Sequence, residues 1–157
     1  MKNVEYYKPQ DPSELQELMQ VHQARAVLIA GGTNLIHQMR NGEKKPEVLV
    51  DISELKDLTG IKVKDNYITI GAVTSIAQIA ASPVIGEHCP ILAAAAKQLG
   101  NPLTRNRATI GGNLANASPC ADTAPPLLAL EAEIHITNAE GQARSVPADK
   151  FFMDYKW

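Results

Sequence analysis

The spacing of hydrophobic residues predicts a helix near the start of the chain. Asp11 suits the N-cap position, Pro12 suits the first helical position, and Glu14 completes the pattern of a capping box. Side chains that share one face then recur three and four residues apart: Leu15, Leu18, Met19 and His22. This periodicity is typical of an amphipathic helix.

Two short apolar runs follow this helix and predict buried strands. The run AVLIA, residues 26–30, continues directly into GGTNL. The run EVLVDIS, residues 47–53, comes after a segment that we expect to form a helical turn. The order of strand, helix and strand implies a small α/β lobe at the beginning of the chain.

Beyond residue 60 the pattern alternates, and it predicts two β-hairpins. IKVKDNYITIG, residues 61–71, alternates apolar and polar side chains around the turn signal Asp65-Asn66. EIHITNAEGQARSV, residues 133–146, has the same alternation. Both segments are therefore expected to be antiparallel hairpins.

Helical signals fill the stretch between these hairpins. Thr74 is expected to cap a short helix through SIAQIAAS, and Ser82 with Pro83 begins another turn. PILAAAAKQLG, residues 90–100, predicts a strong helix, and TAPPLLALEA, residues 123–132, a short one that starts with proline. We therefore expect an N-terminal α/β lobe over residues 1–55 and a larger α+β lobe over residues 56–157.

Composition and charge narrow the classes of function. The 157 residues are 45% hydrophobic and 20% charged, with a net charge of −2, which is typical of a soluble globular protein without affinity for nucleic acid. The opening MKNVEYYKPQ has no apolar core, and no run of about 18 apolar residues occurs, so we expect no membrane insertion. Cys89 and Cys120 have no CxxC partner, and we interpret them as reduced thiols of a cytoplasmic protein.

Histidines do not indicate a metal site. His22, His37, His88 and His135 are scattered without the spacing of metal ligands. We therefore expect no metal ion on this chain.

Two glycine pairs mark the candidate chemistry. The first lies in LIAGGTNLI, residues 28–36, at the end of a predicted strand, where successive N–H groups can form an anion-binding nest. The segment is neither a P-loop nor a GxGxxG dinucleotide motif. Taken alone, it leaves a tight structural turn and a phosphate-binding loop open.

The second glycine pair lies in TIGGNLANASPCAD, residues 109–122. It is surrounded by short polar side chains that are costly to bury without partners: Thr109, Asn113, Asn116, Ser118 and Asp122. An ionised Asp122 only accepts hydrogen bonds and suits ribityl or ribose hydroxyls. Two such segments without lysine predict a nucleotide diphosphate held by backbone amides, and they argue against phosphoryl transfer.

These segments carry a family resemblance. AGGTNLI and RNRATIGGNLANASPCADTAPPLLAL, with ITIGAVTSIAQIA between them, resemble the FAD-binding (medium) subunit of molybdenum hydroxylases of the xanthine dehydrogenase and carbon monoxide dehydrogenase type. The resemblance covers nearly the whole chain. It implies an α+β, vanillyl-alcohol-oxidase-like (PCMH-type) FAD-binding fold in which two lobes hold an extended flavin.

The resemblance also implies which residues contact FAD. Ile29 to Ile36 are expected to wrap the pyrophosphate, mainly through the amides of Gly31 to Leu35. The segment around Ala72 and Thr74 is expected to line the same cleft, and Leu99 to lie near the isoalloxazine. The full set is Ile29, Ala30, Gly31, Gly32, Thr33, Asn34, Leu35, Ile36, Ala72, Thr74, Leu99, Thr109, Ile110, Gly111, Gly112, Asn113, Asn116, Ser118 and Asp122.

In function, the resemblance implies an oxidoreductase subunit that serves as an electron outlet. Substrate is hydroxylated at a molybdenum-pterin centre on a partner subunit, and electrons cross [2Fe–2S] clusters on another partner to FAD and then to NAD⁺ or another acceptor. No residue of this chain is expected to be catalytic, because the cofactor carries the redox chemistry.

Two alternatives stay open beside the electron-transfer subunit. One is a non-catalytic FAD-domain module that only docks on partner subunits, because family members continue past the position of Trp157. The other, a self-contained flavin oxidase, is disfavoured because we find no substrate domain. An isolated chain that ends at Trp157 is expected to bind FAD weakly or to need a partner.

Other side chains of the two segments also have open roles. Arg105 and Arg107 could neutralise phosphates or pair with acidic side chains at the surface. Cys120 could lie near the flavin or serve as a small buried residue.

Overall fold

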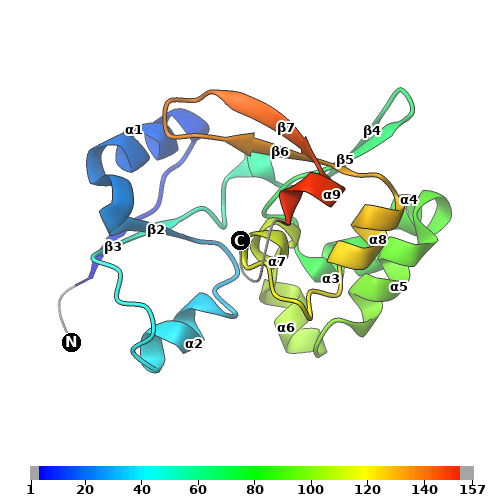
Figure 1. Ribbon diagram of the computed structural model, residues 1–157, viewed down its shortest axis with the longest axis horizontal. Helices are drawn as coiled ribbons and strands as arrows, with labels where there is room; N and C mark the ends of the chain where they lie inside the picture. Colours follow the sequence, from blue (N-terminus) through cyan, green and yellow to red (C-terminus); the bar gives the residue numbers. More distant parts are fainter. Residues whose placement is uncertain (1–3, 153–157) are drawn as a thin grey trace.

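A small parallel sheet stands at one end of the molecule in the computed structural model, which describes residues 4–152 (Figure 1). Its strands are β1 (Glu5–Tyr7), β2 (Ala26–Ile29) and β3 (Val48–Asp51), in the order β1-β3-β2, and all are parallel. The two predicted strands are confirmed. The edge strand β1 was not predicted, because it is short and two of its three residues are exposed.

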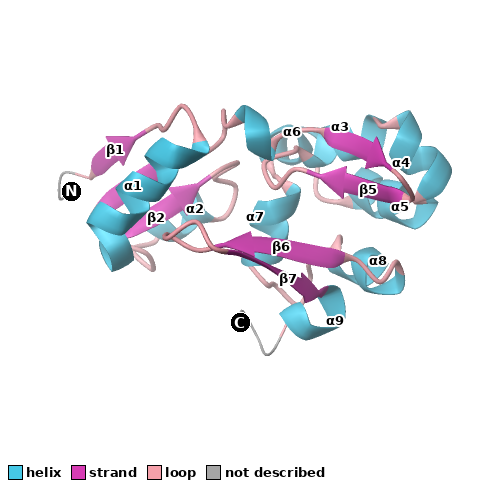
Figure 2. Cartoon of the chain, turned by 90° about the horizontal axis from the view of Figure 1, so that it is seen from above, coloured by secondary structure: helices cyan, strands magenta, loops and turns pink. Residues whose placement is uncertain are grey.

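The helices of this sheet region are α1 (Pro12–His22) and α2 (Leu35–Arg40), with a 3₁₀ turn η1 (Gln23–Arg25) before β2. Figure 2 shows α1 lying over the sheet. Asp11 is the N-cap as predicted, and its carboxylate accepts from the amides of Ser13 and Glu14. The predicted capping box forms with another partner. The Glu14 carboxylate accepts from the amide of Gln10, one residue before the N-cap, and not from the amide of Asp11.

Six short helices form the other end of the molecule. They are α3 (Ile76–Ala81), α4 (Pro83–His88), α5 (Pro90–Gln98), α6 (Pro102–Arg107), α7 (Ile110–Ala115) and α8 (Ala124–Ala129). Their apolar faces form the main core, whose buried members are Ile76, Ile79, Ile85, Leu92, Ala93, Ala96, Leu99, Ala108, Ile110, Leu114 and Leu127. The small side chains of α5 let it lie close to α3.

Two local expectations in this helical region need correction. The cap of α3 is Ser75, whose hydroxyl accepts from the Gln78 amide in a capping box, and not Thr74. The segment after Thr109 was expected to be a loop, but Ile110–Ala115 form the helix α7. Each glycine destabilises a helix by about 1 kcal/mol relative to alanine, so helix propensity does not predict a helix at the Gly111-Gly112 pair.

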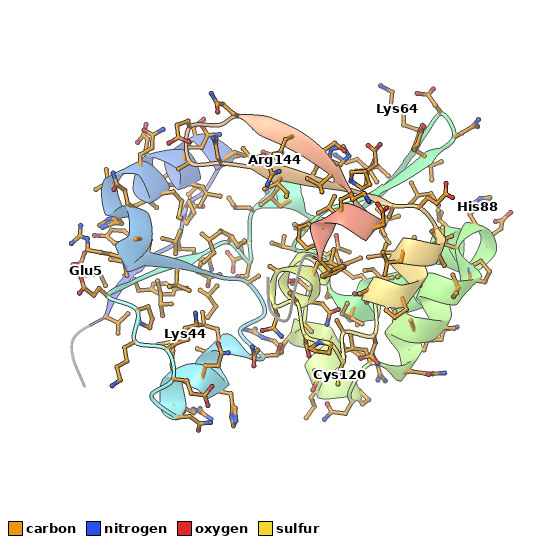
Figure 3. All side chains as sticks on the ribbon, in the orientation of Figure 1. Glu5, Lys44, Lys64, His88, Cys120 and Arg144 are labelled. Carbon is orange, nitrogen blue, oxygen red and sulfur yellow. The ribbon has the colours of Figure 1, made fainter. Side chains whose placement is uncertain are left out.

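Both predicted hairpins are confirmed. The first is β4 (Ile61–Lys64) with β5 (Tyr67–Ile70), and the second is β6 (Glu133–Thr137) with β7 (Ala143–Pro147). The first projects from the molecule, and Figure 3 labels Lys64 near its tip. A 3₁₀ turn η2 (Lys56–Leu58) precedes the first hairpin, and α9 (Ala148–Phe151) follows the second.

Within residues 4–152, no helix is long and apolar enough to cross a membrane, and no group of His, Cys, Asp or Glu side chains has the arrangement of a metal site. The segment FFMDYKW, residues 151–157, lies largely outside the described residues.

Candidate cofactor-binding site

The first glycine pair lies on the loop that joins β2 to α2, at the carboxyl end of β2. Gly32 has a φ of +68°, a left-handed conformation that glycine adopts without strain. Thr33 and Asn34 are exposed at the tip of this loop. In Figure 1 the loop extends toward α6 and α7.

Backbone amides of this loop are available to a ligand. Among residues 4–152, none accepts a hydrogen bond from the backbone N–H groups of Gly31, Gly32, Thr33, Asn34 or Leu35. The first amide after them, that of Ile36, donates to the carbonyl of Gly32 at 3.1 Å. Five consecutive N–H groups without an acceptor among residues 4–152 thus surround a left-handed glycine, which is the backbone arrangement of an anion-binding nest.

Gly31 serves a purpose that the sequence did not reveal. A Cβ atom at Gly31 would lie 1.9 Å from the carbonyl oxygen of Arg107 and 3.1 Å from Cα of Ala108. The loop after β2 therefore packs directly on the backbone between α6 and α7. Only glycine permits this approach, which brings the two glycine-rich segments together.

The second segment is held by a strand-like pairing with residues 72–76. The amide of Ile76 donates to the Ala108 carbonyl at 2.9 Å, and the amides of Ile110 and Gly111 donate to the carbonyls of Thr74 and Ala72 at 3.1 and 2.8 Å. A Cβ at Gly111 would lie 2.7 Å from the Ala72 oxygen. The first glycine of this pair is therefore explained by packing between two chain segments.

The amides at the start of α7 are already bonded within the protein. The hydroxyl of Thr109 accepts from the amide of Gly112 at 3.1 Å, and the carbonyl of Thr109 accepts from that of Asn113 at 2.9 Å. Together with the pairing to residues 72–76, these bonds occupy the N–H groups of all residues from Ile110 to Asn113. This segment therefore offers a ligand its side chains, while the loop after β2 offers backbone N–H groups.

Side chains of α7 and of the segment after it connect to both sides of the site. The amide side chain of Asn34 donates to Oδ1 of Asn116 at 2.5 Å and joins the two segments. Ser118 accepts from the amide of Cys120 at 3.2 Å, and both Cys120, labelled in Figure 3, and Asp122 are exposed. The exposure of Cys120 removes the interpretation as a small buried residue.

Four of the expected residues do not present their side chains at the surface, because Thr74, Leu99, Thr109 and Ile110 are buried. Thr74 is fully buried, and its hydroxyl accepts from the amide of Gly60 at 2.8 Å and donates to the Gly60 carbonyl at 3.1 Å. Leu99 is 6% exposed and belongs to the main core. Ala72, in contrast, is exposed.

The two arginines near the second segment differ in role. Arg105 donates through Nη1 to the carbonyls of Leu99 and Gly100, at 3.0 and 3.2 Å, where α5 ends. Arg105 thus satisfies the carbonyl groups at the end of α5. This role differs from both expected roles, which were to neutralise a phosphate or to pair with an acidic side chain. Arg107 is exposed, and its guanidinium makes no ion pair or hydrogen bond with the described residues.

A family model described as the FAD-binding domain in molybdopterin dehydrogenase matches residues 2–157, nearly the whole chain. The chain belongs to this family. The resemblance inferred from the two glycine-rich segments is thereby confirmed, and with it FAD as the cofactor of the family.

Characterised relatives agree with the family. The FAD-subunit of nicotinate dehydrogenase from Eubacterium barkeri is 37% identical over 97% of this chain and 51% of its own length. The medium chain of carbon monoxide dehydrogenase from Hydrogenophaga pseudoflava is 36% identical over 95% of this chain and 52% of its own. The chain thus spans about half the length of these relatives.

Solved structures confirm the α+β fold class. A chain of carbon monoxide dehydrogenase from Hydrogenophaga pseudoflava, in a form lacking the Mo-pyranopterin moiety, matches 99% of this chain and 54% of its own length with a TM-score of 0.94 at 35% identity. A chain of quinoline 2-oxidoreductase from Pseudomonas putida 86 matches 100% of this chain and 55% of its own length with a TM-score of 0.92 at 26% identity.

Proposed function

We propose that this chain is the FAD-binding part of an electron-transfer subunit of a molybdenum-containing hydroxylase, and that the loop after β2 holds the diphosphate of FAD. The observation that carries the proposal is the run of N–H groups from Gly31 to Leu35, five donors that have no acceptor within the described part of the chain. Diphosphate oxygens only accept hydrogen bonds, so they match a site composed of donors.

The second segment is proposed to bind from the opposite side through its side chains. Asn113 and Asn116 have carboxamides that can donate to phosphate oxygens, while the exposed carboxylate of Asp122 can accept from ribityl or ribose hydroxyls. Thr74 and Leu99 are proposed to support this segment from within the core, since their side chains are buried. The proposed lobes, residues 1–55 and 56–157, each contribute one side of the site.

The chemistry of the proposed function divides between cofactor and protein. FAD, when bound, supplies the redox chemistry that takes electrons from iron–sulfur clusters and passes them to NAD⁺ or another acceptor. The residues of this chain bind and orient the cofactor. The molybdenum-pterin and [2Fe–2S] centres are proposed to lie on partner subunits, and the whole assembly in the cytoplasm.

Reconstitution tests this proposal. The protein with its bound flavin is mixed anaerobically with the iron–sulfur subunit that co-purifies with it. That subunit has first been reduced with dithionite and freed of excess reductant. We expect the visible absorption band of the flavin to bleach and to return when NAD⁺ or an artificial electron acceptor is added. Flavin that stays oxidised would contradict the proposal, and partners that co-purify without any bound flavin would favour a module that only docks on them.

A further inference from the structure

Thr123 has a fully buried hydroxyl that is bonded to a residue of the candidate site. Its side chain lies just before α8, and Oγ1 donates to Oδ1 of Asn113 on α7 at 2.5 Å. Asn113 itself is half-buried. A buried polar group of this kind normally has a structural reason, such as capping a helix.

Helix capping does not explain this threonine. Thr123 occupies the N-cap of α8, but its side chain makes no capping bond. The second and third positions of α8 are Pro125 and Pro126, which have no N–H group, so the amides to which an N-cap hydroxyl normally bonds are missing. The hydroxyl is therefore free to bond Asn113.

This bond determines the orientation of the Asn113 carboxamide. The hydroxyl of Thr123 has one proton, and Oδ1 of Asn113 is its acceptor among the described residues. If the carboxamide were turned over, the buried hydroxyl proton would lose its acceptor, at a cost of about 1–3 kcal/mol. Oδ1 is thus held toward Thr123, and the NH₂ group is left to donate elsewhere.

Asn113 also lies on the side of α7 that meets the loop after β2. Asn113 and Asn116 are three residues apart and share a helix face, and Asn116 is bonded to Asn34 of that loop. The NH₂ group of Asn113 therefore adds donors to the same side of the molecule as the free amides of Gly31 to Leu35.

We propose that Thr123 is a positioning residue that holds Asn113 with its NH₂ group toward the FAD diphosphate, and so makes Asn113 a donor to phosphate oxygens. This inference rests on the proposed function. It assigns the polarity of one contact: the group that Asn113 meets on the cofactor is an acceptor, and not a hydroxyl that donates.

Titration with FAD of the protein together with its co-purifying partner subunits, followed by flavin fluorescence, tests this role in three variants. Thr123→Val removes the hydroxyl at constant shape and should raise the dissociation constant about five- to tenfold, whereas Thr123→Ser should stay within about twofold of wild type. Thr59→Val is the matched control, because its hydroxyl bonds the Leu55 carbonyl outside the site. It should leave the affinity unchanged.

A double-mutant cycle separates positioning from a general structural effect. In an Asn113→Ala background, Thr123→Val should weaken FAD binding no further, because Thr123 acts through Asn113. Losses that multiply independently in the double variant would overturn the proposal.

Asn113→Asp tests the polarity even if Thr123→Val fails to fold. The carboxylate still accepts the bond from Thr123 but has no N–H to offer, so affinity for FAD should fall at least about tenfold. Binding as tight as wild type would overturn the proposal. Failure of wild type to bind FAD would instead count against the proposed function, so the two failures are distinguishable.

Discussion

Nδ2 of Asn34 donates a hydrogen bond to Oδ1 of Asn116 at 2.5 Å, although the two residues are 82 positions apart in the chain. Asn34 lies on the loop after β2, and Asn116 ends α7. This bond and the backbone contact of Gly31 with Arg107 hold the two glycine-rich segments against each other. The candidate site is therefore already assembled by contacts within the protein.

Gly31→Ala should destabilise the protein strongly. The new Cβ would lie 1.9 Å from the carbonyl oxygen of Arg107, and backbone on both sides leaves little room to shift. We expect a loss of at least about 2 kcal/mol in the free energy of unfolding, measured by urea denaturation. Gly86→Ala is the control, because nothing lies within 4 Å of its Cβ in α4, and it should stabilise by up to about 1 kcal/mol. Equal effects would refute the packing role of Gly31.

Thr74→Val should also lower stability, through the loss of two hydrogen bonds to Gly60. The Thr74 side chain is fully buried, and valine leaves the Gly60 amide without its acceptor. The expected cost is about 1–3 kcal/mol in the free energy of unfolding. Thr69→Val, at an exposed position of β5, should change stability by less than about 0.5 kcal/mol. If Thr74→Val left stability unchanged, the hydrogen bonds between Thr74 and Gly60 would not stabilise the segment that pairs with α7.

The hydrogen bond between Tyr6 and Asp51 should make stability depend on pH in the acid range. Asp51 pairs with Ile29 at the end of β2, where the loop after β2 begins. Partial burial raises the pKa of Asp51, but hydrogen bonds from Tyr6 and Ser53 outweigh it, and the pKa lies below its ordinary value of 3.8. A carboxyl with a lowered pKa in the folded state contributes stability above its ordinary pKa and loses it as the pH falls through the folded value.

Tyr6→Phe tests this bond in a series of unfolding measurements across pH. The difference in unfolding free energy between wild type and Tyr6→Phe should be largest near neutral pH and should shrink as the pH falls below 3.8. The bond also raises the pKa of Tyr6 above 10.0, so the difference should fade again in strong alkali. Tyr67→Phe, at an exposed tyrosine of β5, should show no such dependence, and a pH-independent difference for Tyr6→Phe would contradict the account.

Features with a local cause could be predicted from the sequence. Asp11 and Pro12 start α1 because their side chains satisfy or remove N–H groups of the same turn. Asp65 adopts a φ of +54° in the first hairpin turn, as the Asp-Asn signal indicates. The two glycine-rich segments were also expected to act together, because the same polar chemistry occurs in both, and the structure brings them into contact.

Features that depend on distant partners could not be predicted. β1 exists because Glu5–Tyr7 pair with β3, more than forty positions away. α7 forms despite its glycines because residues 108–111 are paired with residues 72–76. Gly31 looks like a phosphate-loop glycine in sequence, and only the structure shows that it meets Arg107. The bond of Thr123 to Asn113 likewise joins two elements whose contact only the fold reveals.

The central claim is that the two segments joined by Asn34 and Asn116 hold FAD. Its most direct test is a fluorescence titration with FAD of the protein together with its co-purifying partner subunits. The titration compares wild type with Asn34→Ala and Asn116→Ala, and with Asn66→Ala as a control in the turn between β4 and β5. We predict saturation at one FAD per chain, a dissociation constant raised about fivefold or more by either site substitution, and no change in the control. An absence of saturable binding, or equal affinity in all four proteins, would contradict the claim.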